Sequence, residues 1–596
     1  HEAVVCETTA LGIENESQGN RAKAYLYCLE TRCPETGWMV PMAPSWVISS
    51  ARGVIAKLVP DRANQRFDIH VLTGVSAAEM LAAELGTIRE GKLVYELDGK
   101  VYRTPIRTVR GDYRDADGNS GNKLRSWEKH DFKPRLDDIF QERLYCVYWV
   151  DGKTLDSTNP VTFLTAVTDE DLIREQRAEL FLEENLCNWQ EQGWLPDMPI
   201  EPGEETARLV REKGWTFWHH LFSPRQLILL AIIKRNILTR DSVSARAELM
   251  TFLCRTLNLS SKLCKLNHSP GPGRMPKIYN MFTGQALNSY FNFGVRASRY
   301  AIEGGQVSRE TPSCEVYCTA FGVESQSSEC TTAAADVLIT DPPYADAVAY
   351  HEITEFFIAW LRKNPPPPFD RWTWDSRRDL AIKGSGDDFR NGMVSAYRAM
   401  TEHMPDNGMQ CVMFTHQDSG VWSDMVSIFW AAGLQVVGAW YIATETTSEL
   451  KKGGYVQGTV ILMLRKRPTG ERPGFKQRIL PEVKREVAAQ IKQMLHLNTE
   501  TEAKMGSPVF NDSDLQMAGY AAALKVLTGY TSIGGEDVTA FALRPRRKGE
   551  ATVVDEIVEQ AAETANSLLV PDGLDGETWQ AIGGMQRFYL RMLDME

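Results

Sequence analysis

The alternation of hydrophobic and polar positions in residues 1–150 predicts a series of short strands. The runs 66–71 and 92–97 alternate apolar with polar side chains, which is the period of a half-buried strand. Asp98 and Gly99 follow the second run directly, and this dipeptide is typical of a two-residue type I′ hairpin turn. We therefore expect a β-rich module at the start of the chain.

The period changes to that of helices after about residue 168. Thr168 and Asp171 have the spacing of a capping box, in which each side chain satisfies the other residue's backbone N–H. A second helix start lies at Ser223, with Pro224 in the first helical position and an apolar run behind it. We expect a helical insertion over residues 151–270.

Residues 271–470 show strand and helix patterns in alternation. The expected elements are a strand at 336–340, helices at 347–362 and 386–404, a strand at 409–415, a helix at 421–432, and strands at 434–442 and 459–464. A polar loop containing glycine joins the last two strands, so they should form an antiparallel hairpin. This order is typical of the second half of a doubly wound α/β sheet, whose ligands bind at the carboxyl ends of the strands. Residues 471–596 should form a helical C-terminal region.

Composition and charge limit the class of protein. The chain has 596 residues, 43% of them hydrophobic, and 66 Lys and Arg against 78 Asp and Glu, for a net charge of −12. These values lie near globular averages and exclude collagen-like, coiled-coil and wholly disordered chains. No apolar run approaches the ~20 residues of a membrane span, and the 11 cysteines are too sparse for a disulfide framework. We expect a soluble, cytoplasmic protein that does not contact a membrane.

Asp341-Pro342-Pro343-Tyr344, directly after the strand 336–340, is the most specific motif in the chain. Two consecutive prolines fix φ and force an extended turn, so the Asp341 carboxylate and the Pro342 carbonyl can converge on one point above the sheet. Two such acceptors suit an exocyclic amine, because it offers two N–H donors and keeps its lone pair free to attack an electrophilic methyl group. Tyr344 offers a face on which a flipped-out base can stack.

These residues resemble the amino-methyltransferase family, which uses S-adenosylmethionine and carries an [Asp/Asn/Ser]-Pro-Pro-[Tyr/Phe] motif. The Asp form is commonest for adenine N6 and the Ser form for cytosine N4. Other stretches are similar to the large bacterial adenine-specific DNA methylases described as containing a zinc ribbon, which often lie among phage-defence genes. These stretches are residues 24–27 with 33–34, 222–227, 283–287 and 355–362.

The resemblance implies a Rossmann-like methyltransferase sheet, a β-rich zinc-ribbon-like module and a helical insertion. It implies adenine-N6 methylation of DNA in a restriction–modification or phage-defence system. The corner at 341–344 would be catalytic. The segment Phe222-Ser223-Pro224-Arg225 resembles a Phe-Thr-Pro-Arg segment by which some amino-methyltransferases touch the cofactor, and its alternative interpretation is an ordinary capped helix start.

The chain departs from that family at two points. Cys33 is followed by Pro34 through Trp38 instead of a second zinc ligand, so we expect a degenerate ribbon without a metal site. A glycine-rich turn between a strand and a helix, which would admit the methionine part of the cofactor, is not recognisable in the sequence. We therefore expect an N-terminal segment outside this chain, or a partner chain, to complete the cofactor site.

Double-stranded DNA is the expected partner, with other defence-system proteins as further ones. Trp372 and Trp374 lie in a basic segment and are candidates for stacking on bases. Arg465, Lys466 and Arg467 are candidates for phosphate contacts, and ordinary solvated surface is the alternative. Two other functions stay open: methylation of cytosine N4 or of an RNA adenine, and a non-catalytic DNA-binding subunit of a defence complex.

Overall fold

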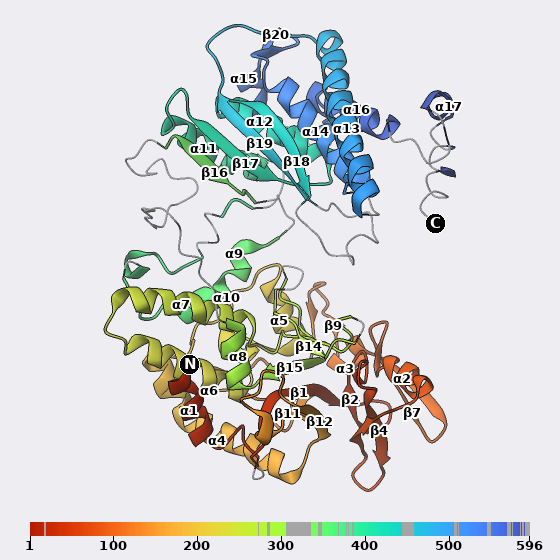
Figure 1. The fold of residues 1–596 in the computed structure, drawn as a ribbon, viewed down its shortest axis with the longest axis vertical. Helices are drawn as coiled ribbons and strands as arrows, with labels where there is room; N and C mark the ends of the chain where they lie inside the picture. Colours follow the sequence, from red (N-terminus) through yellow and green to blue (C-terminus); the bar gives the residue numbers. More distant parts are fainter. Residues whose placement is uncertain are drawn as a thin grey trace. The chain divides into compact units, whose positions relative to one another are not determined.

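The computed structural model divides the chain into two compact units (Figure 1). Unit 1 comprises His1–Gly322 and Ala349–Ser376, and unit 2 comprises Val323–Val348 and Arg377–Glu596. The four-part division expected from the sequence stays a prediction. The structure describes residues 1–16, 19–271, 273–282, 286–305, 335–343, 348–367, 369–376, 378, 381–383, 387–443, 458–505, 509–510, 512–544, 550–568, 574, 576–583, 586 and 589–590.

Unit 1 is built around a sheet of eight strands in the order β12-β11-β1-β2-β5-β4-β3, with β15 also pairing with β1. These strands are β1 (Arg21–Arg32), β2 (Met39–Met42), β3 (Val47–Ser49), β4 (Val54–Asp61), β5 (Arg66–Thr73), β11 (Phe140–Val150), β12 (Thr162–Ala166) and β15 (Asn292–Arg296). The strand expected at 66–71 is confirmed as β5. The same sheet also takes in β12 and β15, which follow residue 150 in the chain.

Short strands complete the β structure of unit 1. They are β6 (Ile88–Arg89), β7 (Lys92–Leu97), β8 (Lys100–Pro105), β9 (Tyr113–Arg114), β10 (Ser120–Gly121), β13 (Leu266–Asn267) and β14 (Lys277–Ile278). β7 and β8 form the expected hairpin, in which Leu97 pairs with Lys100. Asp98 and Gly99 have φ of 52° and 74°, as a type I′ turn requires. The hairpin prediction is confirmed.

Two helices of unit 1 begin at the starts expected from the sequence, Thr168 and Ser223. The helices of this unit are α1 (Glu2–Ala10), α2 (Ala77–Glu84), α3 (Ile106–Arg110), α4 (Asp169–Glu191), α5 (Thr206–Lys213), α6 (Pro224–Leu238), α7 (Val243–Asn258), α8 (Ser298–Gly305), α9 (Tyr350–Ile353) and α10 (Glu355–Leu361). The Thr168 N–H donates to the Asp171 carboxylate at 2.9 Å and the Asp171 N–H donates to the Thr168 hydroxyl at 3.3 Å, which confirms the predicted start of α4. α6 begins at Pro224 and is almost wholly buried.

Unit 2 contains a four-stranded sheet in the order β16-β17-β19-β18. The strands are β16 (Val337–Thr340), β17 (Met409–Phe414), β18 (Leu434–Ala443) and β19 (Gly458–Lys466). β16 and β17 are parallel, and β19 is antiparallel to both β17 and β18. The antiparallel hairpin of the last two strands is therefore confirmed. Because β19 lies between β17 and β18 and is antiparallel to both, β16, β17 and β18 all run in one direction.

Helices cover one face of this sheet (Figure 1). They are α11 (Asp387–Glu402), α12 (Ser419–Ala431), α13 (Lys476–Met505), α14 (Asp512–Leu527), α15 (Val538–Leu543) and α16 (Val553–Ser567). Unit 2 also contains α17 (Gly576–Ala581) and the short strands β20 (Pro473–Gly474), β21 (Ser532–Ile533) and β22 (Glu536–Asp537). Alternate strand residues such as Val412 and Leu462 form one core with these helices. No helix of the described residues has both the length and the apolar character to cross a membrane.

Candidate functional site

The corner that carries the main sequence motif lies at the end of β16. Thr340 is the last residue of the strand, and Asp341, Pro342 and Pro343 follow it directly. Asp341 is exposed, and the two prolines are partly buried. Tyr344 lies outside the described residues. Because β16 and β17 are parallel, this corner shares the carboxyl edge of the sheet with the end of β17.

A buried tyrosine anchors the strand end that precedes the corner. The hydroxyl groups of Thr340 and Tyr397 lie 3.2 Å apart, and Tyr397 projects from α11 with its ring 5.6 Å from the ring of Phe429 in an edge-to-face contact. Burial raises the pKa of the Tyr397 phenol well above its usual value, and the charge of Asp341 acts in the same direction. The phenol therefore stays protonated beside the corner and can donate a hydrogen bond.

The loop after β17 lies at the same edge of the sheet. His416 follows this strand by two residues; its Nδ1 accepts a hydrogen bond from the Asp418 N–H at 3.0 Å, and its carbonyl accepts one from the indole of Trp422 at 2.6 Å. Asp418 in turn caps α12 by accepting from the Gly420 N–H at 2.7 Å. These bonds hold the His416 loop in place beside the corner.

The segment at 222–225, expected to touch a cofactor, is in unit 1. Phe222 is buried, with its ring centroid 5.5 Å from that of Phe356. The Arg225 guanidinium donates to the Glu175 carboxylate at 2.7 Å and lies over the ring of Tyr25 at 4.1 Å. These two residues therefore serve the packing of unit 1, and Ser223 and Pro224 are the members of the segment that reach a cavity.

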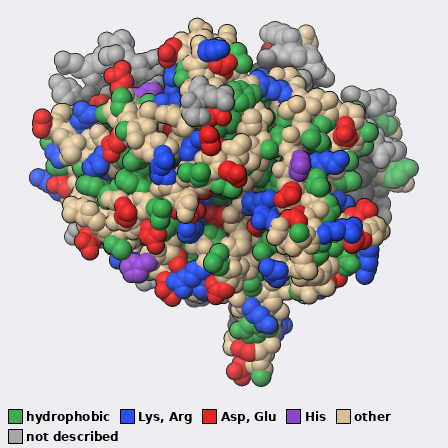
Figure 2. Space-filling model, turned by 90° about the horizontal axis from the view of Figure 1, so that it is seen from below, with side chains coloured by type: hydrophobic (Ala, Val, Ile, Leu, Met, Phe, Trp, Pro, Cys, Tyr) green, Lys and Arg blue, Asp and Glu red, His purple; other side chains and the backbone are tan. Residues whose placement is uncertain are grey.

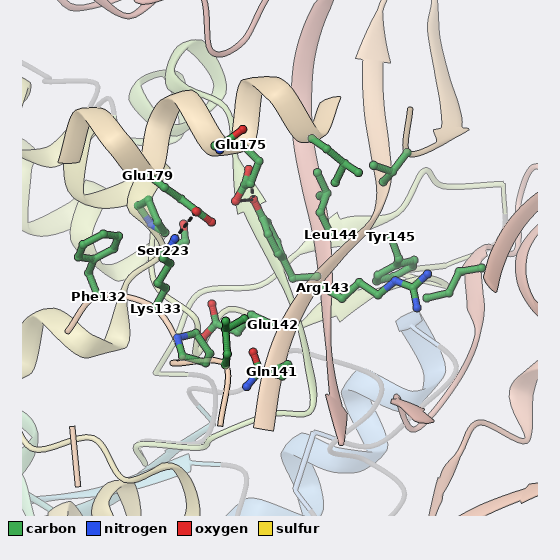
Figure 3. Close-up of a pocket in the computed structure, with 18 of the residues that line it drawn as sticks. Phe132, Lys133, Gln141, Glu142, Arg143, Leu144, Tyr145, Glu175, Glu179 and Ser223 are labelled. Carbon is green, nitrogen blue, oxygen red and sulfur yellow. Dashed lines mark hydrogen bonds and ion pairs between the residues drawn. The ribbon is translucent and has the colours of Figure 1, made fainter. Parts of the chain in front are cut away.

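That cavity has a volume of about 1230 Å³ and lies wholly within unit 1 (Figure 3). Its walls come from β5, β11, α4 and the loop 130–136. The carboxylates of Glu142, Glu175 and Glu179 line it, and the Tyr27 hydroxyl donates to Glu175 at 2.8 Å. The pocket's residues lie far apart in the sequence, and the one local signal of the pocket is the helical spacing of glutamates on α4.

The other residues expected to touch DNA are divided between the two units. Trp372 and Trp374 of unit 1 are partly buried, 6.0 Å apart, and the Trp374 indole donates to the Phe369 carbonyl at 2.9 Å. This arrangement leaves each ring only partly accessible.

In unit 2, Arg465 is exposed, whereas its two neighbours are engaged. Lys466 pairs with Asp406 at 3.2 Å, and Arg467 donates to the Thr539 hydroxyl at 3.2 Å. Two of the three cations are thus already engaged by other side chains of the protein. Figure 2 shows one face of the molecule, on which acidic and basic side chains are mixed.

Cys33, the cysteine singled out in the sequence, is buried, and its thiol lies 3.6 Å from the Thr104 hydroxyl. Cys28 of β1 is buried as well. Within the described ranges, no group of three or more His, Cys, Asp or Glu is arranged to hold a metal ion.

Comparison with known proteins gives no family for the chain. No family model matches it, and neither a curated protein nor a solved structure matches it. The functional assignment therefore depends on the sequence motif and on the geometry of the sites described above.

Proposed function

We propose that this chain carries the base-binding half of an S-adenosylmethionine-dependent methyltransferase that acts on adenine N6 in DNA. The observation that carries the proposal is the position of Asp341-Pro342-Pro343 at the carboxyl end of a strand, in a sheet whose strands β16, β17 and β18 run in one direction. Open α/β sheets bind their ligands at this edge.

In this proposal, the corner orients the amine of the target base. The Asp341 carboxylate and the Pro342 carbonyl accept the two N–H groups, so the nitrogen lone pair is directed away from the ring. Tyr344 stacks on the flipped base. The cofactor, when bound, supplies an electrophilic methyl group. Asp341 stabilises the positive charge that develops on the nitrogen and takes the proton that the nitrogen loses.

The free edge and open face of the sheet support the expectation of a missing half. In the described part of the chain, β16 pairs only with β17. Val337 and Ile339 are 57% and 68% exposed, and Trp440 of β18 is also exposed. Parallel strands are normally buried on both faces, and a long apolar edge strand is normally protected. We propose that an N-terminal segment or a partner chain adds a strand beside β16 and helices over this face.

In this proposal, the additional segment or partner chain also supplies the main part of the cofactor site. The described strands of unit 2 are followed by no glycine-rich turn that opens a helix, so they do not supply the usual place for the methionine part of S-adenosylmethionine. This observation also favours the second candidate function, a DNA-binding subunit that does not turn over. Methylation of cytosine N4 or of RNA is the alternative within enzymes.

The test uses the intact gene product that contains this chain. It is incubated with tritiated S-adenosylmethionine and with duplex DNA or RNA, and the nucleosides are then separated by mass spectrometry. The proposal expects N6-methyladenine in DNA. Modified cytosine beside unmodified adenine would replace the adenine assignment, and labelled RNA with unlabelled DNA would replace the DNA assignment. DNA binding without any labelled base would favour the binding subunit.

A further inference from the structure

The pocket of unit 1 has one wall with a ladder of carboxylates. Glu175, Glu179 and Glu183 of α4 line it, and each is four residues from the next. At 1.5 Å of rise per residue, neighbouring members stand about 6 Å apart along the helix axis. Glu142 of β11 adds a fourth carboxylate from another wall (Figure 3).

The cations around the pocket are already engaged by carboxylates. Arg143 pairs with Glu30 at 3.1 Å and Arg135 with Asp131 at 2.9 Å. Glu183, in contrast, forms no ion pair within the described residues. The uncompensated charge of the pocket is therefore negative, which favours cationic ligands over phosphates.

The carboxylates of Glu142, Glu175 and Glu179 each pair with a cation, and these cations differ in how exposed they are. Glu175 pairs with Arg225, whose side chain is 3% exposed, and Glu142 pairs at 2.6 Å with Lys262, whose side chain is 1% exposed. Both of these cations are fixed in the core.

Glu179 is paired differently, because its partner comes from the rim. Lys133 lies on the loop 130–136 and its side chain is 46% exposed (Figure 3). Burial raises the pKa of Glu179, and Lys133 acts against this shift, while the nearby charges of Glu175 and Glu142 add to it. The Lys133 ammonium thus pairs with Glu179 at a position where the ammonium group of a ligand could bind in its place.

Ser223 and Pro224, at the start of α6, line the same pocket. Ser223 is 1% exposed, and in Figure 3 it is drawn in the same part of the pocket as Glu179 and Lys133. The rings of Phe132 and Tyr145 give the pocket apolar walls.

We propose that this pocket binds a linear aliphatic polyamine, whose ammonium groups pair with the carboxylate ladder of α4 and whose methylene segments lie against the aromatic walls. Polyamines carry ammonium groups separated by three or four methylenes, a spacing close to one helical turn. One ammonium group of the ligand displaces the Lys133 ammonium from its ion pair with Glu179. The proposal does not depend on methyl transfer, so it is tested separately from the proposed function.

The test is calorimetric titration of the full chain with spermidine at constant ionic strength. Glu179→Gln should weaken binding by about tenfold, the loss of about 1.4 kcal/mol. Glu183→Gln, whose side chain is exposed, should weaken binding by several-fold without affecting folding. Lys133→Met should tighten binding, because it removes the competing ammonium. Glu184→Gln is the matched control, since Glu184 lies on the same helix but does not line the pocket.

Each outcome decides the proposal. Weaker binding by the Glu179 and Glu183 variants, tighter binding by the Lys133 variant and no change in the Glu184 control would support it. An equal loss in the Glu184 variant would show general attraction to an acidic protein and would overturn the proposal. Lys133→Met binding no more tightly than the parent would also overturn it. So would ATP or S-adenosylhomocysteine binding in a Glu179-dependent manner while spermidine does not bind.

Discussion

The hydroxyl groups of Thr340 and Tyr397 lie 3.2 Å apart, and this contact ties the last residue of β16 to the buried face of α11. Asp341 is the next residue, so its position depends on where the strand ends. The proposed chemistry needs the Asp341 carboxylate and the Pro342 carbonyl to converge on one amine, and small displacements of catalytic groups are costly. The anchor is therefore part of the proposed site even though it does not touch the base.

Tyr397→Phe removes this anchor while keeping the ring. We expect unit 2 to lose about 1 kcal/mol of stability, the usual value of one hydrogen bond, and methyl transfer by the intact protein to fall several-fold. Tyr530→Phe is the control, because the Tyr530 hydroxyl bonds Glu482 at 2.9 Å in the same unit but away from the corner. Urea unfolding and tritium incorporation measure the two effects. Equal loss of activity in both variants would contradict the anchoring role.

The same substitution should affect the stability of the chain to very different extents at two neighbouring residues of β17. Val412 is fully buried in the core beneath the helices, whereas Met413 lies on the face with Ile461, where burial is only partial. Val412→Ser should destabilise the chain by about 2–3 kcal/mol. Met413→Ser should change the stability of the chain by less than about 0.5 kcal/mol.

Dye binding distinguishes the two faces further. Met413→Ser should lower binding of an apolar dye by the isolated chain, because it removes part of the partly exposed apolar surface of this face. The same substitution should weaken association with whatever segment completes the sheet. Equal destabilisation by Val412→Ser and Met413→Ser would show that both faces are already covered.

The ion pair of Arg225 and Glu175 predicts a strong coupling in stability. Both side chains are largely buried and 2.7 Å apart. Arg225→Met should destabilise unit 1 by about 3–5 kcal/mol, because it leaves the Glu175 carboxylate buried without its cation. The double variant Arg225→Met with Glu175→Gln should regain part of this loss. A double-mutant cycle from urea unfolding measures the coupling, and additive losses would contradict the pairing.

Acid should destabilise unit 1 through His219. Burial lowers the pKa of His219 to about 4, while an unfolded histidine titrates near 6.5. The stabilisation is therefore complete above pH 6.5 and is lost as the pH falls towards 4, because the unfolded state takes up a proton first. Between pH 6.5 and pH 4, the free energy of unfolding of unit 1 should fall by about 3 kcal/mol.

His219→Gln should flatten that pH dependence. Part of the dependence should remain, because burial lowers the pKa of the neighbouring His220 as well. His496→Gln, at an exposed position, is the control. Hydrogen exchange of β1 and β11 between pH 7 and pH 4 follows unit 1 alone. An unchanged slope in the His219 variant would contradict this account.

The elements that depend on neighbours in sequence could be predicted. Thr168 and Asp171 place the start of α4 through contacts only three residues apart, and Asp98-Gly99 determines its hairpin for the same reason. The apolar run before Asp341 is likewise a strand. Each of these signals is local, so it can be recognised from the residues themselves.

Features that depend on distant residues could not be predicted. Nothing in residues 292–296 indicates that they pair with β1, or that β19 lies between β17 and β18. The hydrogen bond of Arg225 to Glu175, fifty residues earlier in the chain, also has no local signal in the sequence. The pocket arises in the same way, because Glu142 and Glu179 come from elements that only the folded chain brings together.

The most direct test is methyl transfer to DNA by the Asp341→Ala variant of the intact protein. Asp336→Ala is the matched control, since it removes the same side chain just before the other end of β16. The account predicts that Asp341→Ala lowers tritium incorporation into adenine by at least about a hundredfold, while Asp336→Ala labels DNA at the parental rate. Parental labelling by Asp341→Ala would contradict the central role of the corner.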